Sequence, residues 1–157
     1  ALFYRVVHEL LLHPRPPGRS CGTDLVAHMP LQDFHPVGKA LANILADTDR
    51  TYHSYHNLEP RNGTLSLYAN LGIEGGVEAA FAILDEENGK AGFKIRLLLD
   101  VLPKYGSAAK AYLPKIRATN AGKFSKQWAE MIKTIEALPD TQTKTLTFDE
   151  AMKTRTR

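Results

Sequence analysis

The sequence predicts an all-α protein, and three features of the chain indicate this fold class. Apolar residues recur at intervals of three and four along most segments, which is the spacing of a helix with one buried face. Proline and glycine lie between these segments, at positions that suit the ends and beginnings of helices. Short polar stretches separate the segments from one another, as loops between helices do.

Length and composition are those of an ordinary soluble domain. The chain has 157 residues, 43% of them hydrophobic and 24% charged, which is enough for one domain with a sizeable core. A net charge of +3 does not by itself require a nucleic-acid partner. No apolar run approaches the roughly 20 residues that span a bilayer, so we expect no membrane partner.

Three helices are expected in the first third of the chain. The first runs over 2–13 and ends at the prolines of 14–18, which cannot continue a helix. The second runs over about 19–29 with Cys21 and Leu25 facing inward, so this single cysteine is expected to be a buried structural thiol. Pro36 opens the third, which continues to Asp47. The uncapped apolar start Ala1–Tyr4 leads us to expect a piece of a longer protein.

The middle of the chain contains its least regular stretch. Residues 52–63 are expected to form an irregular insertion with a turn at 61–63. A helix over 64–71 should end at Gly72, and another should occupy about 74–86. The glycines Gly72, Gly75 and Gly76 follow no strand and belong to no phosphate-loop motif, so a turn between helices explains them.

The clearest helix begins near Phe93. Phe93, Leu97, Val101 and Tyr105 recur every four residues, and this stripe predicts a helix that ends at Tyr105. Gly106 suits the position after a helix, because glycine adopts a positive φ at little cost. Pro114 suits the first position of the next helix.

The last part of the chain predicts two more helices. Residues 124–138 form an amphipathic helix with Trp128 on its apolar stripe, so a core tryptophan is expected. Thr147 and Glu150 have the spacing of a capping box that begins a short last helix. We therefore divide the chain into a helical domain over 1–140 and a capping helix with a loose basic tail over 141–157.

The order loop, helix, glycine, alanine-rich turn and proline resembles a HEAT repeat. The residues that carry the resemblance are Asp85, Gly89, Arg96, Leu102, Gly106, Ala108, Ala109, Ala111 and Pro114. First helices would end near residues 30, 72 and 106, which gives periods of about 42 and about 34 residues. The resemblance implies a right-handed α-solenoid of three to four helical pairs. A plain helical bundle is the alternative.

One stretch exceeds what such a repeat needs. Aromatic and imidazole rings are dense at Tyr52, His53, Tyr55 and His56, beside Arg50. Loops that interrupt a rigid scaffold often carry binding groups, so these five residues are the candidate binding site. Rings that merely seal the insertion, or a metal site at the histidines, are the alternatives. The stretch with the repeats also resembles parts of large bacterial multidomain proteins of unknown function.

The function expected from the resemblance is a non-catalytic protein-interaction or scaffolding module of a larger protein. Its partner would be a protein or peptide, because a solenoid offers an extended surface and needs no active site. We expect no catalytic residue, no metal and no cofactor. Two alternatives remain. One is binding of a nucleic-acid backbone, as in the HEAT-like DNA glycosylases, and the other is a metal-dependent enzyme fragment with a histidine cluster.

Overall fold

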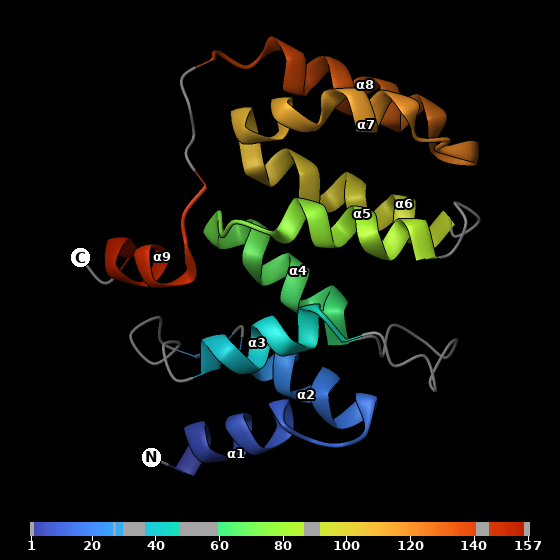
Figure 1. Cartoon of the computed structure of the whole chain (residues 1–157). Coiled ribbons are helices and arrows are strands. Elements are labelled where there is room, and N and C mark those ends of the chain that lie inside the picture. Colours follow the sequence, from blue (N-terminus) through green and yellow to red (C-terminus); the bar gives the residue numbers. More distant parts are fainter. Residues whose placement is uncertain are drawn as a thin grey trace. The chain divides into compact units, whose positions relative to one another are not determined.

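The structure, a computed structural model, describes residues 2–26, 28–29, 37–47, 60–86, 92–140 and 145–155. This part of the chain is all-helical, which confirms the predicted class, and it contains one isolated β-bridge but no strand (Figure 1). It divides into two compact units. Unit 1 contains the residues up to Leu67 and those from Thr147 onward, and unit 2 contains Tyr68–Leu146.

Unit 1 is built from short helices. These are α1 (Leu2–Leu11), α2 (Pro16–Val26), α3 (Gly38–Leu45), the residues of α4 (Pro60–Leu71) up to Leu67, and α9 (Phe148–Arg155). α1 contacts both α2 and α3. The Phe148 ring lies so close to Gly38 that a Cβ there would come within 2.6 Å of it, so α9 packs on the start of α3.

The second helix differs from the prediction at both ends. Its α-helical residues begin at Pro16 rather than near Arg19. Proline is tolerated there because the N–H groups of the first turn have no acceptor within the helix, so the N–H that proline lacks is not missed. It ends at Val26, three residues earlier than expected. The buried residues of α2 are Pro16, Ser20, Gly22, Thr23 and Val26, and Cys21 is exposed. The prediction of a buried thiol at Cys21 is wrong.

The turn predicted at 61–63 is also wrong, because these residues form the first turn of α4. Pro60 opens the helix, and the Thr64 hydroxyl donates a hydrogen bond to the Pro60 carbonyl at 3.2 Å. A Cβ on Gly63 would lie 2.7 Å from the Thr23 hydroxyl of α2. Gly63 therefore lies where α4 and α2 pack closely. Glycine is needed there because a side chain would collide with Thr23, and not because the chain turns.

The end of α4 agrees with the prediction. Gly72 has φ 68°, and its N–H donates to the Ala69 carbonyl at 3.2 Å. The N–H of Ile73 reaches back to the Tyr68 carbonyl at 2.9 Å. This pair of bonds is a Schellman motif, which ends the helix and satisfies its last carbonyls.

Unit 2 contains the helices α5 to α8, and α7 and α8 lie side by side in it (Figure 1). α6 contacts both α5 and α8, and α8 contacts α7. The buried Trp128 of α8 donates its indole N–H to the Ile116 carbonyl of α7 at 2.9 Å, which confirms the predicted core tryptophan. The elements are α5 (Gly76–Glu86), α6 (Gly92–Val101), the 3-10 segment η3 (Leu102–Tyr112), α7 (Leu113–Ala118), η4 (Gly122–Phe124) and α8 (Ser125–Ala137).

The helix that begins near Phe93 ends four residues before the predicted Tyr105. Pro103 explains the difference, because it lacks the N–H that would bond to the carbonyl four residues earlier. The chain continues as η3, in which Gly106 has φ 56° and interrupts the helical backbone. α7 then begins with Pro114 in its first turn, as the sequence predicts.

The capping box of α9 is present as predicted. Thr147 donates its N–H to the Glu150 carboxylate at 2.9 Å, and the Glu150 N–H donates to the Thr147 hydroxyl at 3.2 Å. The division of the chain at residue 140 stays a prediction. Among the described helices, none combines the length and the apolar character that a bilayer crossing demands.

Leu98 provides a test of the core of unit 2, because its side chain is 0% exposed. We expect Leu98→Ala to lower the free energy of unfolding by about 2–5 kcal/mol, through lost burial and the cavity that remains. Leu2→Ala is the matched control, because Leu2 is 76% exposed and should cost about 0.5 kcal/mol or less. Urea denaturation of both variants measures the difference. Equal losses would contradict the burial of Leu98.

Candidate functional site

The predicted binding residues Arg50, Tyr52, His53, Tyr55 and His56 lie outside the described residues, so the structure does not bring them together or separate them. That site stays a prediction. Within the described ranges, no group of three or more His, Cys, Asp or Glu side chains lies close enough together to hold a metal ion. Other surfaces of the two units carry the functional argument.

The first of these is an exposed apolar surface on unit 1, which we call the α1 patch. Its members are large hydrophobic residues of α1 and the residue after it, with exposed fractions of 76% for Leu2, 41% for Phe3, 44% for Val6 and 57% for Leu12. Val7 and Leu11 of the same helix are buried. The apolar arc of this helix is thus wider than the contact it makes within unit 1.

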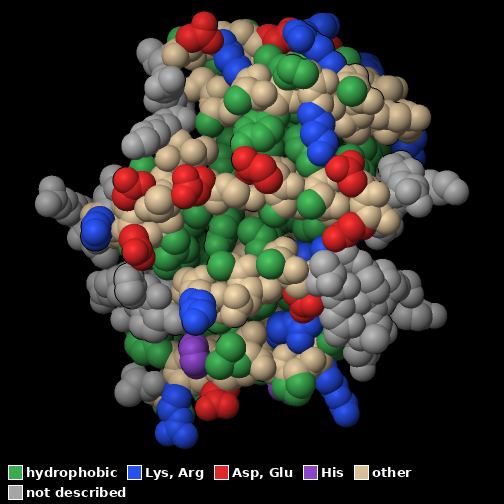
Figure 2. Space-filling model, in the orientation of Figure 1, with side chains coloured by type: hydrophobic (Ala, Val, Ile, Leu, Met, Phe, Trp, Pro, Cys, Tyr) green, Lys and Arg blue, Asp and Glu red, His purple; other side chains and the backbone are tan. Residues whose placement is uncertain are grey.

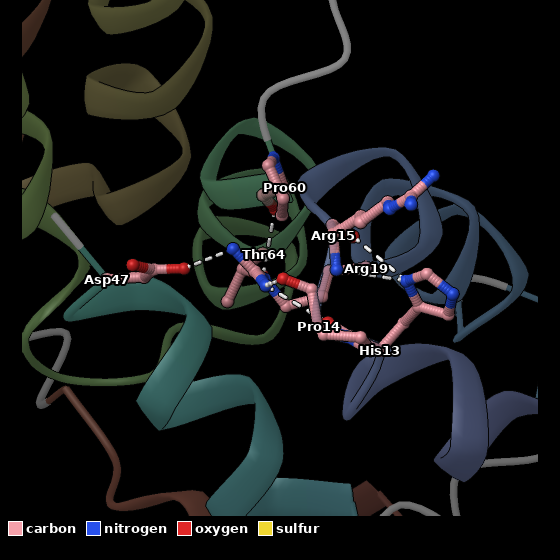
Figure 3. A network of polar contacts seen from close by, with 7 residues as sticks. All are labelled: His13, Pro14, Arg15, Arg19, Asp47, Pro60 and Thr64. Carbon is pink, nitrogen blue, oxygen red and sulfur yellow. Dashed lines mark hydrogen bonds and ion pairs between the residues drawn. The ribbon is translucent and has the colours of Figure 1, made fainter. Parts of the chain in front are cut away.

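A polar network holds the turn between α1 and α2 in place (Figure 3). The Arg19 guanidinium donates to the carbonyls of His13 and Pro14 at 3.0 and 2.9 Å, and it forms an ion pair with Asp47 at 2.5 Å. The acceptors are two backbone carbonyls of the turn and the carboxylate of Asp47, which follows α3. The network therefore fixes the loop after α1 and supports the α1 patch.

Unit 2 contains a cavity of about 150 Å³ at the beginning of α5. The turn between α4 and α5 forms one side, with Gly75 at φ 84°, and η3 forms another. Its lining combines two carboxylates, two phenols and small residues, namely Glu74, Gly75, Val77, Glu78, Tyr105, Ala108, Tyr112 and Thr145.

Tyr105 fixes the geometry of this cavity. The ring is 2% exposed, and its hydroxyl donates to the Ile73 carbonyl at 2.8 Å. A Cβ on Gly76 would lie 1.9 Å from the same hydroxyl, so only glycine allows α5 to begin here. Burial is the largest cause that raises the pKa of Tyr105, and the Glu78 carboxylate adds to it, so the phenol stays neutral.

A second phenol lies on the more open side. The Tyr112 hydroxyl donates to the Glu78 carboxylate. Burial, followed by the hydrogen bond and the charge of Glu78, raises the pKa of Tyr112 to about 12. The exposed Glu74 carboxylate forms no hydrogen bond or ion pair within the described chain. On the face drawn in Figure 2, acidic side chains gather over α5.

The remaining wall is a short extended segment. The Glu74 N–H donates to the Leu146 carbonyl at 2.8 Å, and the Leu146 N–H donates to the Gly72 carbonyl at 2.9 Å. These two bonds form a parallel β-bridge between Ile73 and Leu146. Thr145, the residue before the bridge, lines the cavity.

The sequence predicts the turn at Gly72, Gly75 and Gly76 but not the cavity. Gly75 and Gly76 could have indicated that another group packs closely here, because adjacent glycines at the start of a helix permit close approach. No local pattern indicates Tyr105 or Leu146 as their partners, since both lie far away in the sequence.

The chain was compared with protein-family models, curated proteins and solved structures, and no match was found in any of the three comparisons. What the geometry itself defines is an all-helical protein with an apolar patch on one unit and a small acidic cavity in the other.

The Tyr112–Glu78 contact predicts a pH dependence at high pH. The pKa of Tyr112 is raised from 10.0 to about 12, so folding favours the neutral phenol. The stability that it contributes is fully present below pH 10 and is lost as the pH rises toward 12.

We expect the stability advantage of the wild type over Tyr112→Phe to be smaller at pH 11 than at pH 9, measured by urea denaturation. A spectrophotometric titration should show one tyrosinate transition near pH 12 that Tyr112→Phe removes and Glu78→Gln moves to lower pH. An unchanged titration in both variants would refute the contact.

Proposed function

We propose that this protein is a non-catalytic protein-interaction or scaffolding module with a HEAT-like right-handed solenoid fold, and that its partner is a protein or peptide. The contacts of α5 with α6 and of α7 with α8 are consistent with stacked helical pairs. In such folds each repeat contacts its neighbours, and binding uses the outer surfaces of the stack.

The α1 patch is the observation that carries this proposal. Single exposed hydrophobic residues are ordinary on protein surfaces, but a contiguous group on one helix is typical of an interaction site. Leu2 and Val6 lie four residues apart and therefore share a face of α1, and Phe3 lies beside them. Burial of these side chains by a partner would gain roughly 25 cal/mol for each Å² removed from water.

The charges favour a protein over a nucleic acid. Glu78, Asp85 and Glu86 are exposed along α5, and their carboxylates would repel a phosphate backbone. Several exposed cations are paired with acids, as Lys115 is with Asp85 and Lys110 is with Asp140. Backbone binding would instead use a continuous basic stripe.

The test is photocrosslinking from two positions on helices. A photoreactive phenylalanine analogue at position 6 lies in the α1 patch, and the same analogue at position 126 lies on the exposed polar face of α8. We expect a specific protein product from position 6 only. A product that is nucleic acid would favour the alternative function.

The identified partner is then purified and titrated against variants by calorimetry. We expect Phe3→Ser/Val6→Glu to weaken binding by about ten-fold or more, because contacts at the centre of an interface dominate affinity. Lys126→Glu is the control and should bind like the wild type. Equal affinity of the patch variant and the wild type would exclude the α1 patch as the binding surface.

A further inference from the structure

The backbone after α4 already holds an extended segment of chain in place. Gly72 offers its carbonyl and Glu74 its N–H to the same neighbour, Leu146, and we call these residues the Gly72–Glu74 edge. The pairing is parallel and isolated, and it is the one extended pairing in the described part of the chain. These hydrogen bonds join backbone atoms, so they do not depend on which side chain the neighbour carries. Another extended segment can therefore take the place of Leu146.

The pairing is short enough to be exchanged. It consists of a single bridge, whereas strands in stable sheets commonly have roughly 3–10 residues. Leu146 is only partly buried, so burial of its side chain secures the pairing less than a core residue would. Local opening of such a contact does not require unit 2 to unfold.

The cavity lies beside this edge and is not filled by the present segment. Thr145 lines it, but threonine has a short side chain, and a volume of about 150 Å³ remains. A longer side chain at the same place in an added strand would have room to enter. In strand addition, backbone hydrogen bonds provide affinity and pockets for side chains provide specificity.

The charge of the lining selects the side chain. Glu74 and Glu78 both line the cavity, and among the described residues its lining contains no lysine, arginine or histidine. The amino-terminal end of α5 contributes a partial positive charge of roughly +0.5, which offsets only part of two carboxylates. Tyr112 and Tyr105 are neutral hydrogen-bonding groups at ordinary pH. A lysine or arginine is the side chain that complements this lining.

We propose that the Gly72–Glu74 edge and the adjoining cavity form a peptide-binding site. It takes an extended segment of a partner protein in parallel orientation, with lysine or arginine at the place of Thr145. The chain's own Thr145 and Leu146 are the resident occupant, which the partner segment displaces. This inference rests on the proposed function as an interaction module, but it concerns unit 2 and not the α1 patch.

The first experiment tests the site within the chain. Thr145→Lys places a cation at the cavity, and we expect it to slow hydrogen exchange at the Glu74 amide by about two- to five-fold, the effect of one exposed ion pair. Thr145→Gln is the uncharged control and should exchange like the wild type. In the Glu74→Gln/Glu78→Gln background the effect of lysine should disappear. Equal slowing by lysine and glutamine, or a lysine effect that survives in that background, overturns the proposal.

The second experiment tests displacement by a peptide in solution. Leu146→Pro removes the N–H that bonds to Gly72, one of the two hydrogen bonds at the edge, and so weakens the resident pairing. The probes are two acetylated, amidated pentapeptides, Thr-Lys-Lys-Leu-Thr and Thr-Lys-Glu-Leu-Thr, which differ in the residue that would take the place of Thr145. We expect the lysine peptide to bind this variant about five-fold more tightly than the glutamate peptide does. It should also shift the amide NMR signals of residues 72–74.

Equal binding of the two peptides, or no shift at residues 72–74, contradicts the site. The Thr145→Lys measurement keeps the proposal testable if Leu146→Pro does not fold. Failure of both experiments together with a successful crosslink at position 6 would leave the proposed function intact and remove only this site. If the crosslink fails and both experiments on the site give the expected results, the site stands and the proposed function at the α1 patch is removed.

Discussion

Much of unit 2 depends on the hydrogen bond from the Tyr105 hydroxyl to the Ile73 carbonyl. The bond joins η3 to the turn that follows α4, and it leaves no room for a side chain at Gly76. It also orients the backbone of that turn, so that Gly72 and Glu74 can pair with Leu146. A buried phenol without its acceptor would leave both groups unsatisfied, which is why this contact constrains the conformation of the turn so strongly.

Local chemistry explains which parts of the fold could be predicted. Gly72 and Gly106 adopt positive φ, and the Thr147–Glu150 capping box forms, because each depends on residues within a few positions along the chain. Two errors have identifiable causes, one local and one in the packing of helices. Pro103 ended a helix that the apolar stripe extended to Tyr105, and Gly63 served packing rather than a turn. The prediction gives Pro103 no role, and it assigns Gly63 to a turn.

The cavity could not be predicted, because its walls come from distant segments. Tyr105 and its acceptor Ile73 are 32 residues apart, and Leu146 lies farther still from Gly72. No periodicity within one helix contains such pairings, since they arise only when the helices pack. The ring-rich stretch around Tyr52 drew attention because its composition is unusual, whereas the residues of the cavity are individually ordinary. Composition indicates where a sequence is exceptional, but it does not indicate where ordinary residues converge.

The exposure of Cys21 has a practical consequence for studies in solution. The chain has one cysteine and one tryptophan, and they belong to different units, since Cys21 lies in α2 and Trp128 in α8. A thiol-reactive acceptor on Cys21 can therefore be excited by energy transfer from Trp128 without any substitution in the chain. The efficiency of this transfer depends on the distance between the two residues, so the native protein already carries a spectroscopic probe of the separation of its units.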